Sequence, residues 1–226
     1  MTLTDTEKAV AARKSLEFVK DGMVVGLGTG STATFAIHFL GEQVRAGLKI
    51  RGIPTSRASG ELASSLGIPL TSFDEVSYTD VTIDGADEVA PGLALIKGGG
   101  GALLHEKIVA ASSHRLVIVA DEHKIVEHLG RFPLPVEVIP FAAGPVKKKL
   151  EAMGAHPMLR NGHDGTPYIT DEGNYILDCH YEQILDPATV AQTIKSMTGV
   201  VEHGLFLGLA SVAIVAGPDG ARIITP

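Results

Sequence analysis

Hydrophobic positions in the first half of the chain follow two alternating spacings. Apolar residues three or four apart predict a helix near the N-terminus, at Ala9, Ala12, Leu16 and Val19. Thr4 with Glu7 three residues later predicts a capping box for it. Further helices are predicted over 33–44, 57–66 and 102–111, and short apolar strands over 23–25, 50–53, 81–83, 94–96 and 116–119. Buried strands alternating with helices are typical of a mostly parallel sheet, so we expect a Rossmann-like α/β domain.

The pattern changes near Arg131, where FPLPVEVIPF places three prolines in ten residues. This segment predicts a crossing into a second domain. The order that follows is strand, helix, strand, strand, helix, strand, as in a ferredoxin-like α+β domain. LASVAIVA and ARIIT, joined by the turn sequence GPDG, would then return to the first sheet. We expect an α/β domain over 1–130 and 207–226, with an inserted α+β domain over 131–206.

Composition limits the class of protein. The chain has 226 residues, of which 45% are hydrophobic and 20% charged, which is typical of a folded globular protein. A net charge of -7 argues against binding to nucleic-acid backbones. No apolar run approaches the ~18 residues of a membrane-spanning helix, and the polar start MTLTDTEKAV predicts no signal peptide. The single cysteine, Cys179, excludes an intramolecular disulfide and is expected in the core. We therefore expect a cytoplasmic protein that binds neither nucleic acid nor membranes.

The first polar cluster, Gly28-Thr29-Gly30-Ser31-Thr32, follows a predicted strand and opens a predicted helix. Backbone N–H groups and the helix dipole favour an anion there, and three hydroxyls add donors suited to phosphate. A tight turn without a ligand is the alternative. Gly28-x-Gly30-x-x-Ala33 also fits a dinucleotide loop, although the next strand lacks the carboxylate that would bind the ribose. Arg57 could meet a 2′-phosphate instead, so an NADP-dependent oxidoreductase stays open.

The second cluster, Asp84-Gly85-Ala86-Asp87-Glu88, follows the apolar segment 81–83. Two aspartates three residues apart at the carboxyl end of a strand can face the crevice in which open α/β sheets bind ligands. A solvated turn is one alternative, and a Mg²⁺ site is another. Because Lys97 already supplies a positive charge nearby, we expect no metal there.

The third cluster consists of Lys97, the glycines 98–101, and the helix that follows. Four consecutive glycines cost much conformational entropy, so we expect them to let the backbone approach a ligand. No Gly-Lys-Ser/Thr closes the segment, so it is not a P-loop. Glu106 lies among apolar residues of the helix, where desolvation would raise its pKa and make it a better base. An exposed Glu106 paired with a lysine is the alternative. Lys124, after another predicted strand, could reach the same crevice or lie in a solvated loop.

The motifs GLGTGST, DGADEV, KGGGGALLHEK and DEHK, in this order and spacing, resemble ribose-5-phosphate isomerase type A. The resemblance continues through FPLPVEVIPFA and VVEHGLFLGLA, and so covers essentially the whole chain. It implies interconversion of D-ribose 5-phosphate and D-ribulose 5-phosphate without metal or cofactor, in the non-oxidative branch of the pentose phosphate pathway. The family's pattern often has Arg where His105 stands, and we expect that residue to lie outside the chemistry.

Carried over by motif, Glu106 is the base that takes the proton from C2 and returns it to C1. The residue chemistry agrees, because isomerisation through an enediolate needs a carboxylate base, a group that stabilises charge on oxygen, and a group that moves the hydroxyl proton. Lys97 with the glycine-loop N–H groups suits the second role. Asp84 and Asp87 suit the third, together with ring opening, and the sequence does not decide between them.

The expected substrate-binding residues come from all of these motifs and from the first helix. They are Lys8, Thr29, Gly30, Ser31, Thr32, Asp84, Gly85, Ala86, Asp87, Lys97, Gly98, Gly99, Gly100 and Lys124. The resemblance also implies homodimers or homotetramers. A sugar-phosphate sensor without catalysis is the second hypothesis, although we find no DNA-binding segment that would make it a transcription regulator.

Overall fold

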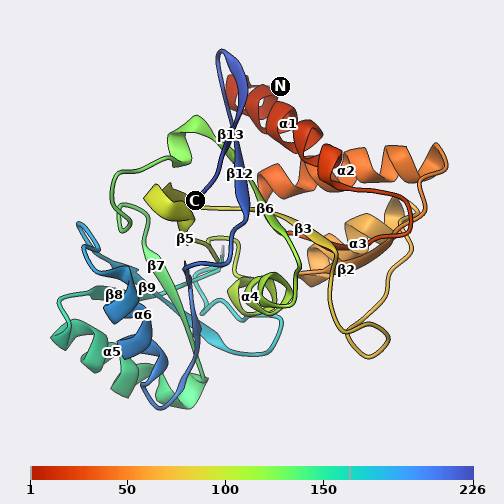
Figure 1. The fold of residues 1–226 in the computed structure, drawn as a ribbon. Helices are drawn as coiled ribbons and strands as arrows, with labels where there is room; N and C mark the ends of the chain where they lie inside the picture. The colour runs from red at the N-terminus through yellow and green to blue at the C-terminus, as the bar shows by residue number, and fades with distance from the viewer. Residues whose placement is uncertain (1, 163) are drawn as a thin grey trace. The chain divides into compact units, whose positions relative to one another are not determined.

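The computed structural model describes residues 2–162 and 164–226 (Figure 1). The chain packs into two compact units, each built from separate segments. The first unit comprises Met1–Ala86, His105–Ile125 and Gly208–Pro226, and the second comprises Asp87–Leu104 and Val126–Leu207. These units differ from the predicted domains by grouping 87–104, 126–130 and Leu207 with the second part of the chain. The predicted domains themselves stay a prediction.

A six-stranded sheet in the order β13-β12-β6-β3-β1-β2 forms the centre of the first unit. Its strands are β1 (Val24–Leu27), β2 (Arg51–Pro54), β3 (Val81–Gly85), β6 (Leu116–Asp121), β12 (Val212–Gly217) and β13 (Gly220–Ile224). Every neighbouring pair is parallel except the hairpin of β12 and β13. The predicted mostly parallel α/β sheet is therefore confirmed, including the return of the last two strands.

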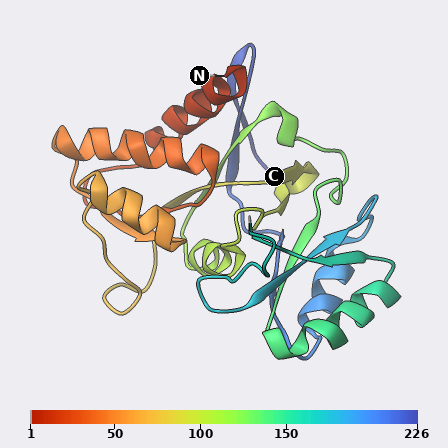
Figure 2. The same cartoon turned by 180° about the vertical axis from the view of Figure 1, so that it is seen from behind.

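Helices cover both faces of this sheet because its strands are apolar on both sides. Val25 and Leu27 of β1 join the core made with α1 (Leu3–Ser15) and α2 (Ser31–Arg45), which lie against each other (Figure 2). The intervening Val24 points to the opposite face, as alternation along a strand requires, and packs with Val109 of α4 (Leu103–Ala111). The remaining helix, α3 (Arg57–Ser65), packs against β2 and α2. The carboxyl ends of β1 and β3 thus lead directly into the polar clusters of the sequence.

The start of α1 differs from the prediction. Its N-cap is Thr2, whose hydroxyl accepts the N–H of Asp5 at 3.1 Å while the Asp5 carboxylate accepts the N–H of Thr2 at 3.0 Å. These hydrogen bonds hold the pKa of Asp5 below its ordinary value. The predicted box of Thr4 and Glu7 is wrong, because an equivalent pair with the same spacing lies two residues earlier.

The second unit contains the predicted βαββαβ arrangement. Its elements are β7 (Leu134–Val138), α5 (Ala143–Ala152), β8 (His156–Leu159), β9 (Tyr175–His180), α6 (Pro187–Lys195) and β10 (Val200–His203). The antiparallel sheet has the order β10-β7-β9-β8, which is that of a ferredoxin-like fold. Alternate residues of β7 and β9 form one core with Val146 and Leu150 of α5 and Ile194 of α6, so both helices cover the same face. Asp186 is the N-cap of α6, and Pro187 is its first residue.

A small antiparallel sheet, β11-β5-β4, completes the second unit and corrects two predictions. Its strands are β4 (Glu88–Ala90), β5 (Ala94–Ile96) and β11 (Leu205–Phe206). The strand predicted over 94–96 lies here and not in the parallel sheet. The last strand of the predicted α+β order is broken at Gly204, whose N–H donates to Pro135 and whose carbonyl accepts the N–H of Lys97. The chain therefore leaves one sheet at Gly204 and enters the other.

Short 3₁₀ helices connect several of these elements. They are η1 (Leu16–Phe18), η2 (Pro91–Leu93), η3 (Glu122–Lys124) and η4 (Pro140–Ala142).

Candidate active site

In the first unit, the loop from β1 to α2 is held closely against the end of β3. A Cβ atom at Gly28 would overlap the side chain of Asp84, so only glycine fits there. Asp84 is fully buried, and its Oδ1 accepts the N–H groups of Thr29 at 3.0 Å and Gly85 at 2.8 Å. Gly30 is the N-cap of α2, with φ of 102°. The first N–H groups of a helix have no partner within it, so this terminus can receive an anion.

Thr29 has a role in this loop that the sequence did not indicate. Its hydroxyl donates to Ser56 Oγ at 2.8 Å and lies 2.7 Å from the Thr55 hydroxyl, while its N–H is bonded to Asp84. Thr29 therefore fixes the loop in this structure, whereas the side chain of Ser31 is exposed. Neither Thr55 nor Ser56 belongs to a recognisable motif, and only the adjacency of β1 and β2 brings them to Thr29.

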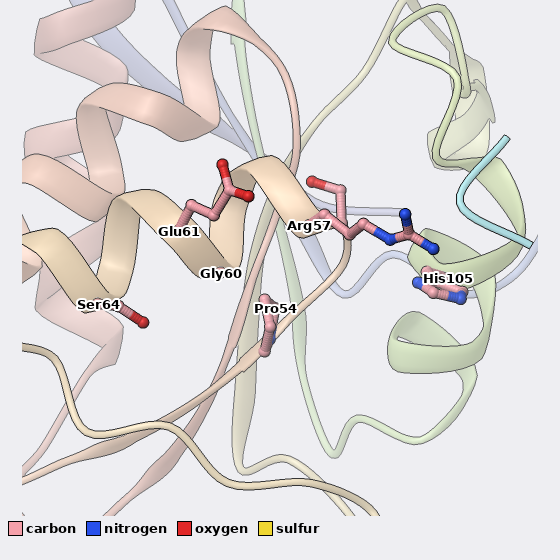
Figure 3. Close-up of a pocket in the computed structure, with 7 residues that line it drawn as sticks. Pro54, Arg57, Gly60, Glu61, Ser64 and His105 are labelled. Atoms are coloured by element: carbon pink, nitrogen blue, oxygen red, sulfur yellow. The ribbon is translucent and has the colours of Figure 1, made fainter. Parts of the chain in front are cut away.

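A pocket of about 670 Å³ lies next to Ser56, the residue to which the Thr29 hydroxyl donates. It is lined by Pro54, Ser56, Arg57, Gly60, Glu61, Ser64 and His105. Figure 3 shows the Arg57 side chain extending from the start of α3 toward His105 on α4. His105 thus faces this pocket, and Arg57, which we considered for a 2′-phosphate, lines it as well.

Glu106, the predicted base, lies on the first turn of α4 and is 4% exposed. The predicted burial is confirmed, and an exposed Glu106 is excluded. Lys124 lies in η3, directly after β6, and Lys8 lies in α1. Both lysines are partly buried. The first unit therefore contains the predicted base, the predicted phosphate loop, Asp84 and two of the predicted lysines.

The second unit contains Asp87, Lys97 and the glycine loop, which we define as residues 97–101. Lys97 is 1% exposed, and its Nζ lies 5.4 Å from the centroid of the Phe206 ring. The Asp87 carboxylate accepts the N–H of Gly99 at 2.7 Å. Asp87 and the glycine loop, ten residues apart in sequence, are thus joined by a hydrogen bond to a charged acceptor, which is stronger than one between neutral groups.

Two further residues of the second unit that bind its loops were not predicted. Glu88 is fully buried, and its carboxylate accepts the N–H groups of Gly130 at 2.8 Å and Phe132 at 2.7 Å. Arg160 donates to the carbonyls of Gly98 and Gly99. The only sequence signal for Glu88 was its place in the motif DGADE, which does not show that it is buried. Arg160 belongs to no motif.

Within residues 2–162 and 164–226, no three His, Cys, Asp or Glu side chains are grouped so as to hold a metal ion. In the same residues, no helix is long and apolar enough to span a membrane.

Comparison with known proteins identifies the family. The model of the family described as ribose 5-phosphate isomerase A (phosphoriboisomerase A) matches residues 51–220. The chain belongs to this family. As a member, it is an isomerase, and the resemblance expected from the four motifs is confirmed.

Relatives are similar to the chain over nearly its whole length. Ribose-5-phosphate isomerase A of Nitrobacter hamburgensis is 51% identical, over 99% of this chain and 99% of that protein. The protein of the same name from Bradyrhizobium diazoefficiens is 50% identical, over 97% of this chain and 95% of the relative.

Solved structures agree on the fold. Ribose 5-phosphate isomerase A from Neisseria gonorrhoeae superposes with a TM-score of 0.93 at 47% identity, over 100% of this chain and 99% of that one. A D-ribose-5-phosphate isomerase in complex with phospho-erythronic acid gives a TM-score of 0.96 at 39% identity, over the full length of both chains. These similarities confirm the α/β fold class and do not favour the sensor hypothesis.

Proposed function

We propose that the chain interconverts D-ribose 5-phosphate and D-ribulose 5-phosphate through an enediolate, with Glu106 as the general base and no metal or organic cofactor. The observation that carries this proposal is the buried Glu106 on the first turn of α4, nine residues after Lys97, in a chain of the ribose 5-phosphate isomerase A family. Burial suits a base, because a carboxylate with little water around it holds a proton more readily.

The phosphate would bind at the start of α2. The N–H groups of Ser31 and Thr32 and the exposed hydroxyl of Ser31 suit its oxygens, and Lys8 and Lys124 would add positive charge. Gly30 leaves room for the phosphate, and Thr29 would fix the loop in its binding conformation. Phosphate binding far from C1 and C2 supplies energy that places the C2 hydrogen against the base.

Asp84 and Asp87 would bind the sugar hydroxyls, assist opening of the ring and move the hydroxyl proton. Each carboxylate is oriented by backbone N–H groups, Asp84 by Thr29 and Gly85 and Asp87 by Gly99. Gly85 and Ala86 connect the two aspartates, which lie three residues apart in the chain.

The proton transfer then follows in balanced steps. The Glu106 carboxylate takes the proton from C2 of the open-chain aldose, and the electron pair moves to O1, which forms the enediolate. Lys97 and the N–H groups of Gly98 and Gly100 would stabilise the negative oxygen, while the N–H of Gly99 holds Asp87. The protonated Glu106 returns the proton to C1, and the proton of O2 passes to O1, which leaves the ketose carbonyl at C2.

We also propose that the protein acts in the cytoplasm as a homodimer or homotetramer whose only partner besides its own copies is the pentose 5-phosphate. The support for this assembly is the resemblance of the chain to the family. Light scattering of the purified protein would distinguish the two forms from a monomer.

The test is turnover of EDTA-treated protein on ribose 5-phosphate beside the Glu106→Gln variant. We expect fast isomerisation by the unmodified chain and a loss of at least ~10²–10⁴-fold in the variant. Glu75→Gln is the matched control, because Glu75 is exposed and its described side-chain contacts are with Thr71 and, at 4.0 Å, with Arg51, both outside the proposed site. Near-normal turnover by Glu106→Gln would reject the base. Saturable binding of the sugar phosphate without turnover by the unmodified chain would support a sensor.

A further inference from the structure

Arg160 binds the glycine loop from within the second unit. It follows β8, and its Nη1 donates to the carbonyl oxygens of Gly98 at 3.1 Å and Gly99 at 3.0 Å. The other side of the guanidinium faces Asp178 of β9, with Nε donating to Oδ2 at 2.8 Å and Nη2 donating to Oδ1. The two side chains are only 15% and 20% exposed, so the pair is partly shielded from water.

The sheet fixes the direction of the guanidinium. Asp178 pairs with Met158 across β8 and β9, and the N–H of Arg160 donates to Ile176 at 2.9 Å. A bidentate arginine–carboxylate pair holds the guanidinium in one plane, which a lysine could not do. Arg160 therefore reaches the glycine loop from a rigid strand pair.

Because each peptide group is planar, these hydrogen bonds also restrict the directions of the N–H groups in the loop. The Gly98 carbonyl shares a peptide with the N–H of Gly99, and in a trans peptide the two point in opposite directions. This peptide is held at both ends, by Arg160 on its oxygen and by Asp87 on its N–H. The Gly99 carbonyl shares the next peptide with the N–H of Gly100. When Arg160 binds that oxygen, the N–H of Gly100 points away from Arg160.

We propose that Arg160, oriented by Asp178, is a positioning residue that sets the glycine loop so that the N–H of Gly100 meets the negative oxygen of the enediolate. Without it, consecutive glycines would sample many conformations, and the N–H would meet that oxygen only part of the time. Arg160 acts through the loop and touches no reacting atom. The inference rests on the proposed isomerase function.

Arg160→Met and Asp178→Asn test the proposal. We expect Arg160→Met to lower kcat by about 10²-fold, the loss typical of one missing oxyanion donor, with little change in KM. Affinity for phospho-erythronic acid should fall by a similar factor, because its carboxylate carries negative charge on oxygen as the enediolate does. Arg160→Lys should recover only part of the loss, and Asp178→Glu should recover more activity than Asp178→Asn.

Lys195→Met is the matched control, since Lys195 forms an ion pair with Glu202 of the same unit at 2.6 Å and contacts no glycine of the loop in the hydrogen bonds described. It should leave kcat and inhibitor affinity unchanged. A folded Arg160→Met protein with unchanged kcat and inhibitor affinity would overturn the proposal. A variant with a raised KM and unchanged kcat would overturn it as well. If the unmodified chain shows no turnover, the isomerase function fails, and the affinity for phospho-erythronic acid in Arg160→Met still decides whether Arg160 orders the loop.

Discussion

Asp84 and Glu88 are both fully buried carboxylates, and each is bonded to backbone N–H groups of segments far along the chain. Asp84 holds Thr29 in the first unit, and Glu88 holds Gly130 and Phe132 in the second. A buried charge is tolerated only where hydrogen bonds replace the water it has lost. The motif DGADE therefore supplies structural anchors as well as candidate ligands for the sugar.

Replacing Glu88 by Leu should destabilise the protein. The N–H of Gly130 is buried and that of Phe132 partly buried, and the variant leaves both without this acceptor, at a cost of about 1–3 kcal/mol for each. Urea unfolding of the variant beside Glu88→Gln, which keeps one acceptor oxygen, measures the loss. Glu151→Leu is an exposed control in the same unit. A Glu88→Leu protein as stable as the unmodified chain would show that these bonds contribute nothing net.

At the scale of elements, the apolar periodicity predicted the helices and most strands to within a few residues. It succeeded for β1, α2 and α3 because burial on a defined face leaves a pattern in the local sequence. It could not place β5, since apolar alternation says that a strand is buried but not which strand it pairs with. β5 pairs with β4, directly before it, and with β11, far along the chain. Arg160 was missed for the same reason, because only the fold brings it to Gly98 and Gly99.

The glycine between β1 and α2, Gly28, is the next position at which a substitution tests the structure. Gly28→Ala should abolish turnover and lower the thermal midpoint, because the new Cβ would overlap Asp84 and the backbone of Ile83. The loop and the end of β3 would have to move apart, and with them the candidate phosphate and sugar sites.

Gly144→Ala is the control for that substitution. Gly144 lies exposed in α5, and a Cβ there meets nothing within 4 Å, so alanine should stabilise the helix by up to ~1 kcal/mol. Differential scanning calorimetry and turnover compare the two variants. An active, normally stable Gly28→Ala protein would contradict the close approach of β1 and β3.

At the scale of the whole molecule, the chain leaves the first unit and returns to it twice. The sequence predicted one excursion, at the proline-rich segment. It did not predict that 87–104 would belong to the second unit, because the bonds from the glycine loop to Arg160 join residues about 60 positions apart. Composition predicted a folded globular protein and the apolar pattern predicted the α/β class, but neither carried information on this division.

The thiol of Cys179 tests whether the strands of the second unit stay closed in the native protein. It lies in β9, between β7 and β8, and its side chain has no exposed surface. Burial raises the pKa of its thiol to about 12, so the thiol stays protonated and unreactive at pH 8. We expect no reaction with Ellman's reagent in the native protein and one thiol per chain in guanidinium chloride. Native protein that reacts as fast as the unfolded chain would show that β9 opens readily. Cys179→Ala, unreactive in both states, is the control.

Isomerisation in D₂O would show whether Glu106 carries a proton between C2 and C1. Proton magnetic resonance of ribose 5-phosphate and ribulose 5-phosphate would follow deuterium entering at these carbons. We predict that the unmodified chain, treated with EDTA, incorporates solvent deuterium as it isomerises, because a protonated Glu106 exchanges with solvent. Glu106→Gln should neither isomerise the sugar phosphate nor incorporate deuterium at a comparable rate. Isomerisation with no carbon-bound deuterium would show that the C2 hydrogen is retained, either by hydride transfer or by a Glu106 shielded from solvent, and would contradict the predicted exchange. Undiminished incorporation by Glu106→Gln would assign the base to another residue and would contradict the proposed mechanism.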